Sequence, residues 1–410
     1  MCPSFRVTRD EEHVTRGRAN TLRLALSGQL GADAVTGDAV HDAMELCVGC
    51  KGCKRECPTG VDMARMKIEL LDHYKRRHGH SRKDRLVAWL PDYGHRLGRI
   101  AGLANLAARL PGAAALTEKI FGLSSRRRLP VWRRDTFWRA RDRAMFASAD
   151  ATLAAARSGG KAAVLFVDTF NGLLESENAL AAARVLHAAG YTLHTLEKAA
   201  GHHCCGRTFL AAGMVDEAKA RTGALVQALL PFAEADIAVV GLEPSCLLTL
   251  RDEALAMHLG DAAHVVAAQA LLFEEFIVRE SAAGRFDLAF EPMAQPILVH
   301  GHCHQKAFGA ASAVLDALRL IPGAAPEMVE TSCCGMAGSF GHEDAHYDMS
   351  MQMAELSLLP AIRKATSAIV VADGTSCRTQ IADGAGREAL HCAIVLDRQR
   401  SRSPRPTDAP

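Results

Sequence analysis

The sequence predicts a small helical domain followed by a duplicated α/β domain built around parallel sheets. Three observations support this prediction: a tight run of cysteines near the N-terminus, an alternation of short apolar and longer helical segments after about residue 160, and a recurrence of cysteine motifs. Hydrophobic residues make up 49% of the 410 residues and aromatic residues 5%. This Ala- and Leu-rich composition favours helices and α/β folds over sandwiches and barrels.

Charge and hydropathy exclude several classes of protein. Lys and Arg number 48 against 46 Asp and Glu, so the net charge of +2 gives no argument for binding nucleic acid. No run of about 18 apolar residues is present, so we expect no transmembrane segment. We also expect no secretory signal, because no charged and then apolar leader precedes Arg6.

The 13 cysteines gather in short motifs. A long chain with clustered thiols is more typical of metal or redox chemistry in a reducing compartment than of a disulfide scaffold. We therefore expect a cytoplasmic protein, with peripheral attachment to the inner face of the membrane as a second expectation.

Residues 1–75 are expected to form the helical domain and residues 76–155 a basic helical connector. Apolar residues from Met63 to Tyr74 follow helical spacing. Residues 75–143 contain 18 Lys and Arg against five acids, which gives this block a net charge of +13. The charge is explained either by solvated helix faces or by docking to an acidic partner domain or anionic lipid.

The remainder alternates between strand and helix patterns, which implies parallel, Rossmann-like sheets. Strands are predicted at 162–167, 191–196 and 237–241, with helices at 176–189 and after Ser245. The same order returns with strands at 296–299, 328–329 and 367–371, and helices at 307–320 and after the last strand.

Three landmarks recur between the two predicted halves, 156–285 and 286–398, which precede a tail at 399–410. Because sites in parallel sheets lie at the carboxyl ends of strands, we expect the halves to pack face to face with their cysteine loops on one side. The recurrence indicates a duplication: Cys204-Cys205-Gly206 corresponds to Cys333-Cys334-Gly335, Pro244-Ser245-Cys246 to Thr375-Ser376-Cys377, and Asp168-Thr169-Phe170 to His302-Cys303-His304.

Cys47, Cys50, Cys53 and Cys57 form a C-x2-C-x2-C-x3-C-P run that ends at Pro58. This spacing is typical of ferredoxin-type domains, because three thiolates at two-residue gaps can surround one face of a [4Fe–4S] cubane. Zinc is the alternative, but zinc pairs of this kind usually have a longer spacer between them. The sequence therefore predicts at least one [4Fe–4S] cluster.

Cys57 is not expected to complete this cluster, because in two-cluster domains the fourth cysteine of such a run ligates the other cluster. The other early Cys-Pro pair contains Cys2, so we expect Cys2 to join Cys47, Cys50 and Cys53. The alternatives are a disordered terminal thiol for Cys2 and an unpaired or inter-chain ligand for Cys57. On this interpretation the sequence looks as if it starts inside a cluster motif, either as the tail of a longer polypeptide or cut back to one intact cluster.

The first 75 residues, with the segments Cys2–Thr8 and Thr15–Asn20, resemble the helical ferredoxin module of FAD-linked D-2-hydroxyacid dehydrogenases and oxidases. Residues from about 160 to 395 resemble the duplicated cysteine-rich CCG domain of those proteins and of heterodisulfide reductase. The family includes glycolate oxidase, D-lactate dehydrogenase and bacterial D-2-hydroxyglutarate dehydrogenase. The resemblance implies FAD on a partner domain or subunit, because no Gly-rich dinucleotide fingerprint is recognised in this sequence.

The second half keeps Cys303, Cys333, Cys334 and Cys377 of the five-cysteine family motif, with Gly374 at the remaining position. Four thiolates suffice for a cubane or for zinc, so an iron–sulfur cluster, zinc and a redox or structural thiol set all stay open. Five thiolates, as in the noncubane clusters of heterodisulfide reductase, are not available, so disulfide reduction at such a cluster is not expected.

The first half keeps only three cysteines, and Thr169 and Glu243 occupy the other two motif positions. Either Glu243 or His203 supplies a fourth ligand, or the half is a decayed copy, which is the preferred interpretation. The three candidate metal or redox residues are Cys204, Cys205 and Cys246.

Histidines and basic residues flank both cysteine sets. In a strand-like segment His302 and His304 lie on one side and Cys303 on the other, and we expect hydrogen-bonding or structural roles for both histidines. Metal ligation or proton donation is the alternative. Arg207 and Lys306 are candidates to face a cluster or an anionic substrate, and residue 392 is most simply a core thiol.

The resemblance implies an electron-transfer component of a flavin-dependent D-2-hydroxyacid (lactate, glycolate or 2-hydroxyglutarate) dehydrogenase. Single electrons would pass from the partner's flavin to an acceptor such as quinone or another electron carrier. No residue of this chain is expected to oxidise the hydroxyacid. The alternatives are a thiol/disulfide oxidoreductase and a zinc-stapled, non-catalytic binding module.

Overall fold

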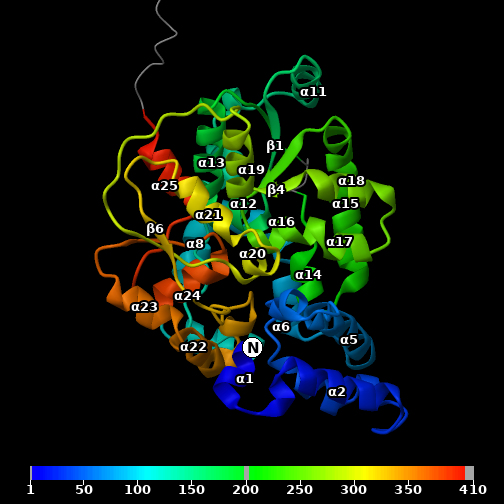
Figure 1. The fold of residues 1–410 in the computed structure, drawn as a ribbon. Coiled ribbons are helices and arrows are strands. Elements are labelled where there is room, and N and C mark those ends of the chain that lie inside the picture. Colours follow the sequence, from blue (N-terminus) through cyan, green and yellow to red (C-terminus); the bar gives the residue numbers. More distant parts are fainter. Residues whose placement is uncertain (1, 198–202, 402–410) are drawn as a thin grey trace, which may run out of the picture.

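The computed structural model describes residues 2–197 and 203–401 (Figure 1). Within them the chain is rich in helix and contains two small parallel sheets, one in each cysteine-rich half. The N-terminal helices α1 (Pro3–Thr8) and α2 (Thr15–Leu26) lie below the sheets in Figure 1. The helical and α/β classes predicted from the sequence are confirmed, whereas the Rossmann-like designation and the domain boundaries stay predictions.

The first sheet has four parallel strands in the order β2-β1-β3-β4. Its central run from Ala162 is apolar because helices cover both faces of the sheet, and the last four residues of β1 are buried. The predicted strands and the helix at 176–189 are confirmed to within a few residues, and β4 was not predicted. The elements are α11 (Ala149–Arg157), β1 (Ala162–Phe166), α12 (Thr169–Leu173), α13 (Ser176–Ala188), β2 (Thr192–His194), α14 (Arg207–Ala211), α15 (Val215–Ala233), β3 (Ala238–Gly241), α16 (Pro244–Arg251), α17 (Glu253–Ala256), α18 (Asp261–Gln269), β4 (Ala270–Leu272) and α19 (Phe273–Ala282).

The second sheet repeats this plan with the order β6-β5-β7. Leu390 adds a parallel bridge to Val371, at the place that β4 takes beside β3 in the first sheet. The helix predicted at 307–320 corresponds to α21, which begins only at Ala311, because Gly309 with a φ of +73° separates it from the preceding α20. The elements are β5 (Ile297–Val299), α20 (Cys303–Ala307), α21 (Ala311–Leu318), β6 (Pro326–Met328), the short turns η4 (Phe340–His342) and η5 (Asp344–His346), α22 (Tyr347–Glu355), α23 (Leu358–Lys364), β7 (Ile369–Val371), α24 (Thr375–Ala385) and α25 (Cys392–Gln399).

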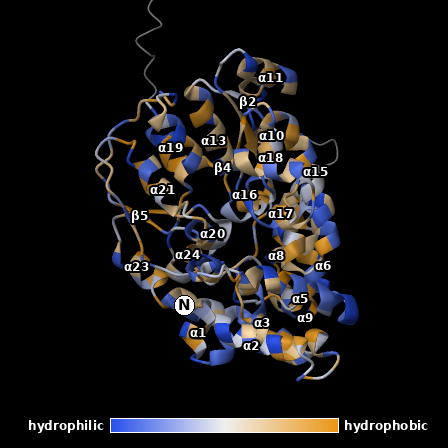
Figure 2. Ribbon diagram, turned by 45° about the vertical axis from the view of Figure 1, so that its right-hand side comes forward, coloured by the Kyte–Doolittle hydropathy of each residue, from blue (hydrophilic) through white to orange (hydrophobic). Residues whose placement is uncertain are grey.

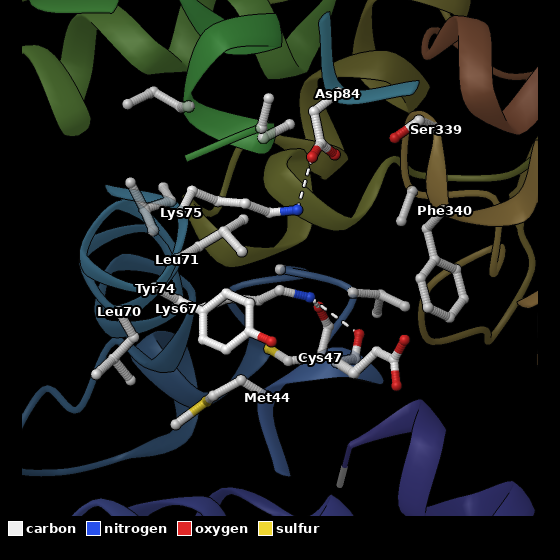
Figure 3. A pocket seen from close by; sticks show the side chains of 18 of the residues that line it. Met44, Cys47, Lys67, Leu70, Leu71, Tyr74, Lys75, Asp84, Ser339 and Phe340 are labelled. Carbon is white, nitrogen blue, oxygen red and sulfur yellow. Dashed lines mark hydrogen bonds and ion pairs between the residues drawn. The ribbon is translucent and has the colours of Figure 1, made fainter. Parts of the chain in front are cut away.

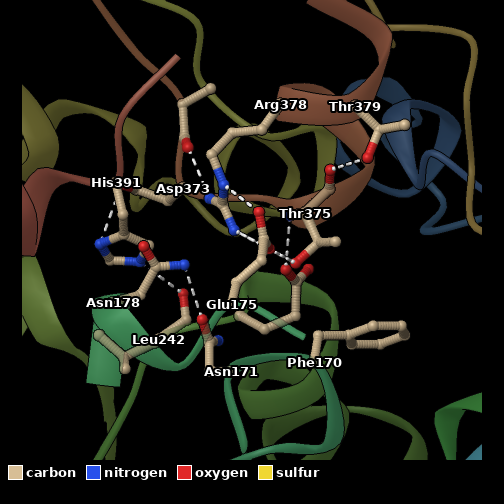
Figure 4. Close-up of polar contacts among 12 residues, drawn as sticks. Phe170, Asn171, Glu175, Asn178, Leu242, Asp373, Thr375, Arg378, Thr379 and His391 are labelled. Carbon is tan, nitrogen blue, oxygen red and sulfur yellow. Dashed lines mark hydrogen bonds and ion pairs between the residues drawn. The ribbon is translucent and has the colours of Figure 1, made fainter. Parts of the chain in front are cut away.

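The two halves share one hydrophobic core. Helices α13 and α19 of the first half pack against α25 and α21 of the second, as expected for face-to-face packing. Beside this core, the Glu175 carboxylate accepts hydrogen bonds from the Arg378 guanidinium and from the Thr375 hydroxyl (Figure 4). His391, which starts α25, bonds to the carbonyl oxygen of Leu242 at 3.2 Å. The halves are therefore joined by buried polar bonds as well as by apolar contact.

The N-terminal helices build a small core of their own, and Met63 at the start of α5 is 1% exposed. The α5 helix begins at an Asp62 cap, whose carboxylate accepts from the Arg65 backbone N–H. Figure 2 shows hydrophilic colour dominating α5 and apolar colour on the helices around the first sheet. The remaining elements of this module are η1 (Glu11–His13), η2 (Ala34–Thr36), α3 (Asp38–Glu45), α4 (Gly52–Glu56) and α5 (Met63–His78).

The basic connector forms short helices, as the proline spacing predicts. Pro91 occupies the first turn of its helix, where a missing N–H is tolerated. Of the described helices, none is both long and apolar enough to cross a membrane. The connector elements are α6 (Arg82–Ala88), α7 (Leu90–Arg99), α8 (Ala101–Ala108), α9 (Ala113–Phe121), α10 (Phe137–Ala140) and η3 (Arg143–Met145). The predicted tail lies outside the described residues from 402 onward.

Candidate metal centres

The structure gathers Cys2 with the first three cysteines of the ferredoxin-type run. Burial, together with the negative charges of Cys303, Cys47 and Cys2, raises the pKa of Cys50. Burial and the charges of Cys47 and Cys2 likewise raise the pKa of Cys53. Cys2 and Cys47 are thus close enough to Cys50 and Cys53 to oppose the ionisation of those two thiols, which is the arrangement that a shared cation or cluster relieves.

Local backbone geometry explains how the run folds around this point. Gly49 and Lys51 both have positive φ, +60° and +56°, so the chain reverses between successive cysteines. The Met63 backbone N–H donates to the Cys53 sulfur at 3.4 Å, and the Lys67 ammonium donates to the Cys47 carbonyl oxygen at 2.7 Å. Two hydrogen bonds from helix α5 therefore position the ferredoxin-type run.

Cys2 reaches the run because it precedes α1. It occupies the N-cap position of this helix, and Pro3 stands in the first turn, where its fixed φ favours helix initiation. The Cys2 sulfur lies 3.2 Å from the Thr15 hydroxyl, and the α1 residue Arg6 donates to the Ser332 hydroxyl at 3.5 Å. The second cysteine-rich half thus helps to position Cys2.

Cys57 stands apart from these four thiols. Its sulfur lies 3.1 Å from the Thr59 hydroxyl, and this bond together with the N–H groups of Val61, Thr59 and Gly60 lowers its pKa. The arrangement agrees with the expectation that Cys57 does not complete the cluster of the first three cysteines.

In the second half, four cysteines form a continuous chain of sulfur contacts. Hydrogen bonds join the side chain of Cys303 to Cys333, that of Cys333 to Cys334, and that of Cys334 to Cys377; all four are free cysteines. Gly335 makes this possible: it has a φ of +86°, and a Cβ there would lie 2.4 Å from the Ser350 carbonyl oxygen. The tight turn lets two adjacent cysteines face the same site, as predicted.

The pKa values in this set alternate. The hydrogen bond from Cys333 lowers the pKa of Cys303 to about 6 against the effect of burial. Hydrogen bonds also lower the pKa of Cys334, whereas those of Cys333 and Cys377 are raised by donating to their neighbours. Lowered and raised pKa values therefore alternate along the four thiols, and the thiols with the lowered pKa give up their protons to a cation most readily.

His300 is a site residue that the sequence analysis missed. It is 1% exposed, its Nδ1 atom bonds to the Thr331 hydroxyl at 2.9 Å, and its ring lies beside Cys334. Within the described residues, the ligand atoms of His300, Cys334 and Cys377 all lie within 4.8 Å of one another. Its place directly after a buried strand was the available signal.

His302 does not lie on a strand, so the strand geometry expected for this segment is wrong, although the rings of His302 and His304 do lie together, with their centroids 5.2 Å apart. It caps α20. Its Nδ1 atom accepts from the His304 backbone N–H at 3.1 Å, and its backbone N–H donates to the Gln305 side-chain oxygen. Because Nδ1 accepts, the ring proton of a neutral His302 must be on Nε2. This favours hydrogen bonding over metal ligation.

The His302 ring occupies the space beside the missing fifth cysteine. A Cβ built on Gly374 would lie 2.4 Å from the ring carbon Cδ2 and 3.4 Å from the Cys377 sulfur. A larger residue at 374 would therefore need the ring to move. The other flanking histidine, His304, bonds to the Gly49 carbonyl oxygen at 3.1 Å and so contacts the ferredoxin-type run.

The two basic candidates have different partners. Lys306 donates to Thr331 and to the Ser332 carbonyl oxygen, so it holds the loop that leads into Cys333. Arg207 forms an ion pair with Glu253 at 2.7 Å. The Lys306 ammonium is therefore occupied by the loop, whereas Arg207 also lines the cavity beside Cys47.

The three thiols of the first half are also in contact, and the side chain of Cys205 is hydrogen-bonded to both Cys204 and Cys246. Glu243 is unsuited to be their fourth ligand, because one of its oxygens caps α16 and the other accepts from the Thr375 backbone N–H at 2.8 Å. His203 lines a separate surface cavity. The geometry thus agrees with a reduced copy of the second site. The last cysteine, Cys392, is fully buried in the shared core.

The ferredoxin-type run and the second thiol set are in contact. Cys50 packs against the cluster of side chains that contains Cys333, Cys334 and Cys377, and the charge of Cys303 acts on its pKa. Arg55 also donates to the Lys306 carbonyl oxygen at 3.0 Å. The two candidate centres are therefore neighbours.

The first half holds the run through buried charges instead. Lys51 is 1% exposed and forms ion pairs with Asp252 at 2.6 Å, Glu253 at 3.0 Å and Asp62 at 3.3 Å. Lys54 pairs with the same Asp252 carboxylate. These bonds fix the run between the two halves.

A cavity of about 200 Å³ lies on the other side of Cys47 (Figure 3). Its apolar wall includes Leu71 and Phe340, and its polar wall includes Lys67 and the ion pair of Lys75 with Asp84 at 2.6 Å. A small ring system is the kind of molecule that such a space admits.

Both thiol sets have the donor chemistry that iron–sulfur clusters require. Each set offers four thiols, and thiolate sulfur is the ligand that cubane clusters take from proteins. The second set also offers His300, so it fits a single zinc ion as well.

Comparison with known proteins agrees with this arrangement. A family profile described as a 4Fe-4S dicluster domain matches residues 1–61, and a cysteine-rich domain profile (CCG) matches residues 168–251 and again 297–382. D-2-hydroxyglutarate dehydrogenase of Pantoea ananatis is 24% identical over 95% of this chain and 41% of its own length. The Escherichia coli enzyme of that name is 24% identical over 97% and 41%.

A third relative is a component of the anaerobic glycerol-3-phosphate dehydrogenase of E. coli, 26% identical over 52% of this chain and 52% of its own length. The chain spans about two fifths of the length of the D-2-hydroxyglutarate dehydrogenases that it matches.

The chain thus carries a 4Fe-4S dicluster domain and a duplicated cysteine-rich domain, the combination of an iron–sulfur oxidoreductase. More particularly, it is related to D-2-hydroxyglutarate dehydrogenase and to a component of anaerobic glycerol-3-phosphate dehydrogenase. The resemblance to the iron–sulfur portion of FAD-linked oxidoreductases that was predicted from its motifs is confirmed.

Proposed function

We propose that this chain is the electron-transfer component of a flavin-dependent D-2-hydroxyacid dehydrogenase, with lactate, glycolate or 2-hydroxyglutarate as the substrate class of its partner. The observation that carries the proposal is the contact between Cys50 and the second thiol set at Cys303. Two adjacent redox centres can pass electrons from one to the other, whereas two structural metal sites gain nothing from lying close together.

Cys2, Cys47, Cys50 and Cys53 would hold a [4Fe–4S] cluster, and Cys303, Cys333, Cys334 and Cys377 a second cluster or zinc. When bound, such a cluster takes up and releases one electron at a time. The surrounding residues supply a rigid frame: Lys51 and Asp252 fix the run on one side, and His304 fixes it on the other.

The hydroxyacid would be oxidised on a partner that carries FAD, and the acceptor would be a quinone or another electron carrier. The cavity beside Cys47 is the place where a small acceptor would come nearest to the first centre. We place the protein in the cytoplasm, attached peripherally to the inner face of the membrane.

The first test measures iron, zinc and acid-labile sulfide per chain after anaerobic purification. About eight iron atoms with eight sulfides support a two-cluster relay, and about four place one cubane on the ferredoxin-type run. Cys50→Ser is expected to lose the signal of the first cluster in electron paramagnetic resonance. Cys57→Ser is the matched control and is expected to keep it, because its sulfur points elsewhere.

The purified chain is expected not to reduce a dye with D-2-hydroxyacids alone. Hydroxyacid-dependent dye reduction without an added flavoprotein would contradict the proposal. Transfer that requires the flavoprotein and disappears in Cys50→Ser would support it.

A thiol/disulfide oxidoreductase is the second candidate, favoured by the contact between the half-buried Cys303 and Cys333. These two thiols could give up two electrons and two protons to an external disulfide and become a disulfide themselves. Disulfide reduction that is lost in Cys333→Ser and kept in Cys47→Ser would favour this function.

A zinc-stapled binding module is the third candidate, favoured by the His300, Cys334 and Cys377 group. Zinc without labile sulfide would support it and would exclude the relay.

A further inference from the structure

The connector exposes an apolar surface on α8 and α9. Of the twelve large apolar side chains that are exposed in the described part of the chain, eight lie between Ile100 and Val131. Leu103 is 68% exposed, Leu106 60% and Leu116 58%. Single exposed leucines are common, but such a concentration in 32 residues marks an interaction surface.

These side chains lie on elements that are neighbours in the fold. Helix α9 packs against α8, and the segment that carries Val131 is hydrogen-bonded to α8 at its next residue. The Asn105 side chain donates to the Trp132 carbonyl oxygen at 2.8 Å and accepts from its N–H at 2.9 Å. We call this face, made by Ile100, Leu103, Leu106, Leu110, Leu116 and Ile120 with Val131 at its edge, the leucine surface.

Basic residues surround the leucine surface, and within the described structure most have no acidic partner. Residues 96–134 contain nine Arg and Lys against one acid, Glu118, whose carboxylate accepts from the Ser125 backbone N–H. Arg126, Arg127 and Arg133 form ion pairs. Among the described residues, no ion pair involves the other six: Arg96, Arg99, Arg109, Lys119, Arg128 and Arg134.

We infer that the leucine surface binds the surface of an anionic lipid bilayer, with its leucines among the headgroups and acyl chains and its arginines on the lipid phosphates. Aliphatic side chains within a rim of Arg and Lys are the composition of interfacial membrane helices. Protein interfaces rely more on Trp, Tyr and Met, and hot spots are poor in Leu. The inference deepens the proposed peripheral attachment by naming the surface and the lipid class.

The position of the surface suits an acceptor dissolved in the membrane. Helix α6 supplies Asp84 to the cavity beside Cys47, and α9 packs on the same helix. The leucine surface and the cavity are thus separated by one helix.

The test is flotation of the full chain with vesicles, with and without bound metal. Vesicles that contain about one third phosphatidylglycerol are compared with pure phosphatidylcholine vesicles. We expect binding to the anionic vesicles, at least tenfold weaker binding to neutral ones, and weakening at high salt.

The diagnostic variant is Leu103→Glu/Leu106→Glu/Leu116→Glu, which is expected to lose binding at least tenfold while keeping the wild-type circular dichroism spectrum. Leu26→Glu is the matched control, because Leu26 is also 68% exposed but lies on the N-terminal module. It is expected to bind like the wild type.

Equal binding of the triple variant and the wild type would overturn the inference, as would failure of the wild type to bind. If the triple variant instead loses binding to an FAD-containing partner, the surface is a protein interface and the inference is wrong. Because flotation does not depend on a cluster, a failed relay and a failed membrane surface give different results.

Discussion

The two cysteine-rich halves repeat one architecture but meet the ferredoxin-type module with different chemistry. The first half contributes buried charges, with Asp252 paired to Lys51. The second half contributes its cysteine loop, with Cys303 beside Cys50 and His304 bonded to Gly49. The two copies thus hold the same module by different contacts, buried ion pairs in the first half and the cysteine loop in the second.

The halves also differ at the position of the missing motif cysteine. In the first half this position is Glu243, which caps a helix and reaches across to Thr375. In the second it is Gly374, which leaves room for the ring of His302 beside the Cys377 sulfur. Glu243 thus serves the joint between the halves, whereas Gly374 shapes the surroundings of the second thiol set.

The largest effect is expected for metal content. Cys334→Ser should remove nearly all metal from the second half, because Cys334 contacts two other thiols and faces His300. Cys205→Ser, the equivalent change in the first half, should leave metal content unchanged. Metal analysis of both variants is the measurement, and an equal loss in the two would remove the distinction between the halves.

Lys51→Met should destabilise the protein by about 3 kcal/mol, because it leaves Asp252, Glu253 and Asp62 buried without their central cation. Lys54→Met is the control, since Lys54 is 32% exposed and its loss should cost less than about 1 kcal/mol. Chemical unfolding measures both. A similar cost for the two lysines would show that the first half is not anchored by the buried charge.

Gly374→Ala should cost about 1–3 kcal/mol by overpacking, because the new Cβ meets the His302 ring. The backbone itself allows alanine, since Gly374 has a φ of −85°. Combining it with His302→Ala should recover much of this cost, and a double-mutant cycle measures the coupling. Additive costs would mean that the ring does not fill this space.

The smallest effect concerns pH. His346 forms ion pairs with Glu45 of the N-terminal module and with Glu343, and these outweigh burial and raise its pKa. Its contribution, about 1 kcal/mol, should therefore be complete below pH 6.5 and be lost as the pH rises through the raised pKa. Unfolding of His346→Gln should accordingly differ from wild type at pH 6 and converge at higher pH.

His73→Gln is the control for this pH dependence, because His73 is exposed and lies 3.8 Å from Glu69. It should unfold like the wild type at every pH. The ion pair of Lys51 with Asp252 should not weaken over the same range, because the pKa of Lys51 is raised and that of Asp252 is lowered.

The sequence predicted the features that local spacing determines. The ferredoxin-type run, the repeated Cys-Cys-Gly turns and most strands follow from patterns within a few residues, and Gly335 takes the predicted turn. The place of His300 and the close approach of His302 to Gly374 depend on strands and loops far apart in the chain. No local pattern encodes such contacts. A helix also begins at Cys303, where a strand-like segment was expected.

The charge of Lys51 illustrates the same limit. A lysine between two cysteines gives no sign in the sequence that it will be buried against Asp252, 201 residues away. Burial of a charge depends on which acids the fold brings together, so it becomes visible only in three dimensions.

The contacts of the N-terminal module have a consequence for how the protein is made. Its thiols leave the ribosome before those of the two halves. The hydrogen bonds between Gly49 and His304 and between Arg6 and Ser332 cannot form until the second half has been synthesised, and Ser332 follows Arg6 by 326 residues. At about 5–20 residues per second, some 300 residues take roughly 15–60 seconds to synthesise. The cysteines that are synthesised first are thus covered last. A cubane inserted early would be exposed to oxygen and to competing metal ions before the second half covers it. Cluster insertion is therefore best timed after the second half has folded.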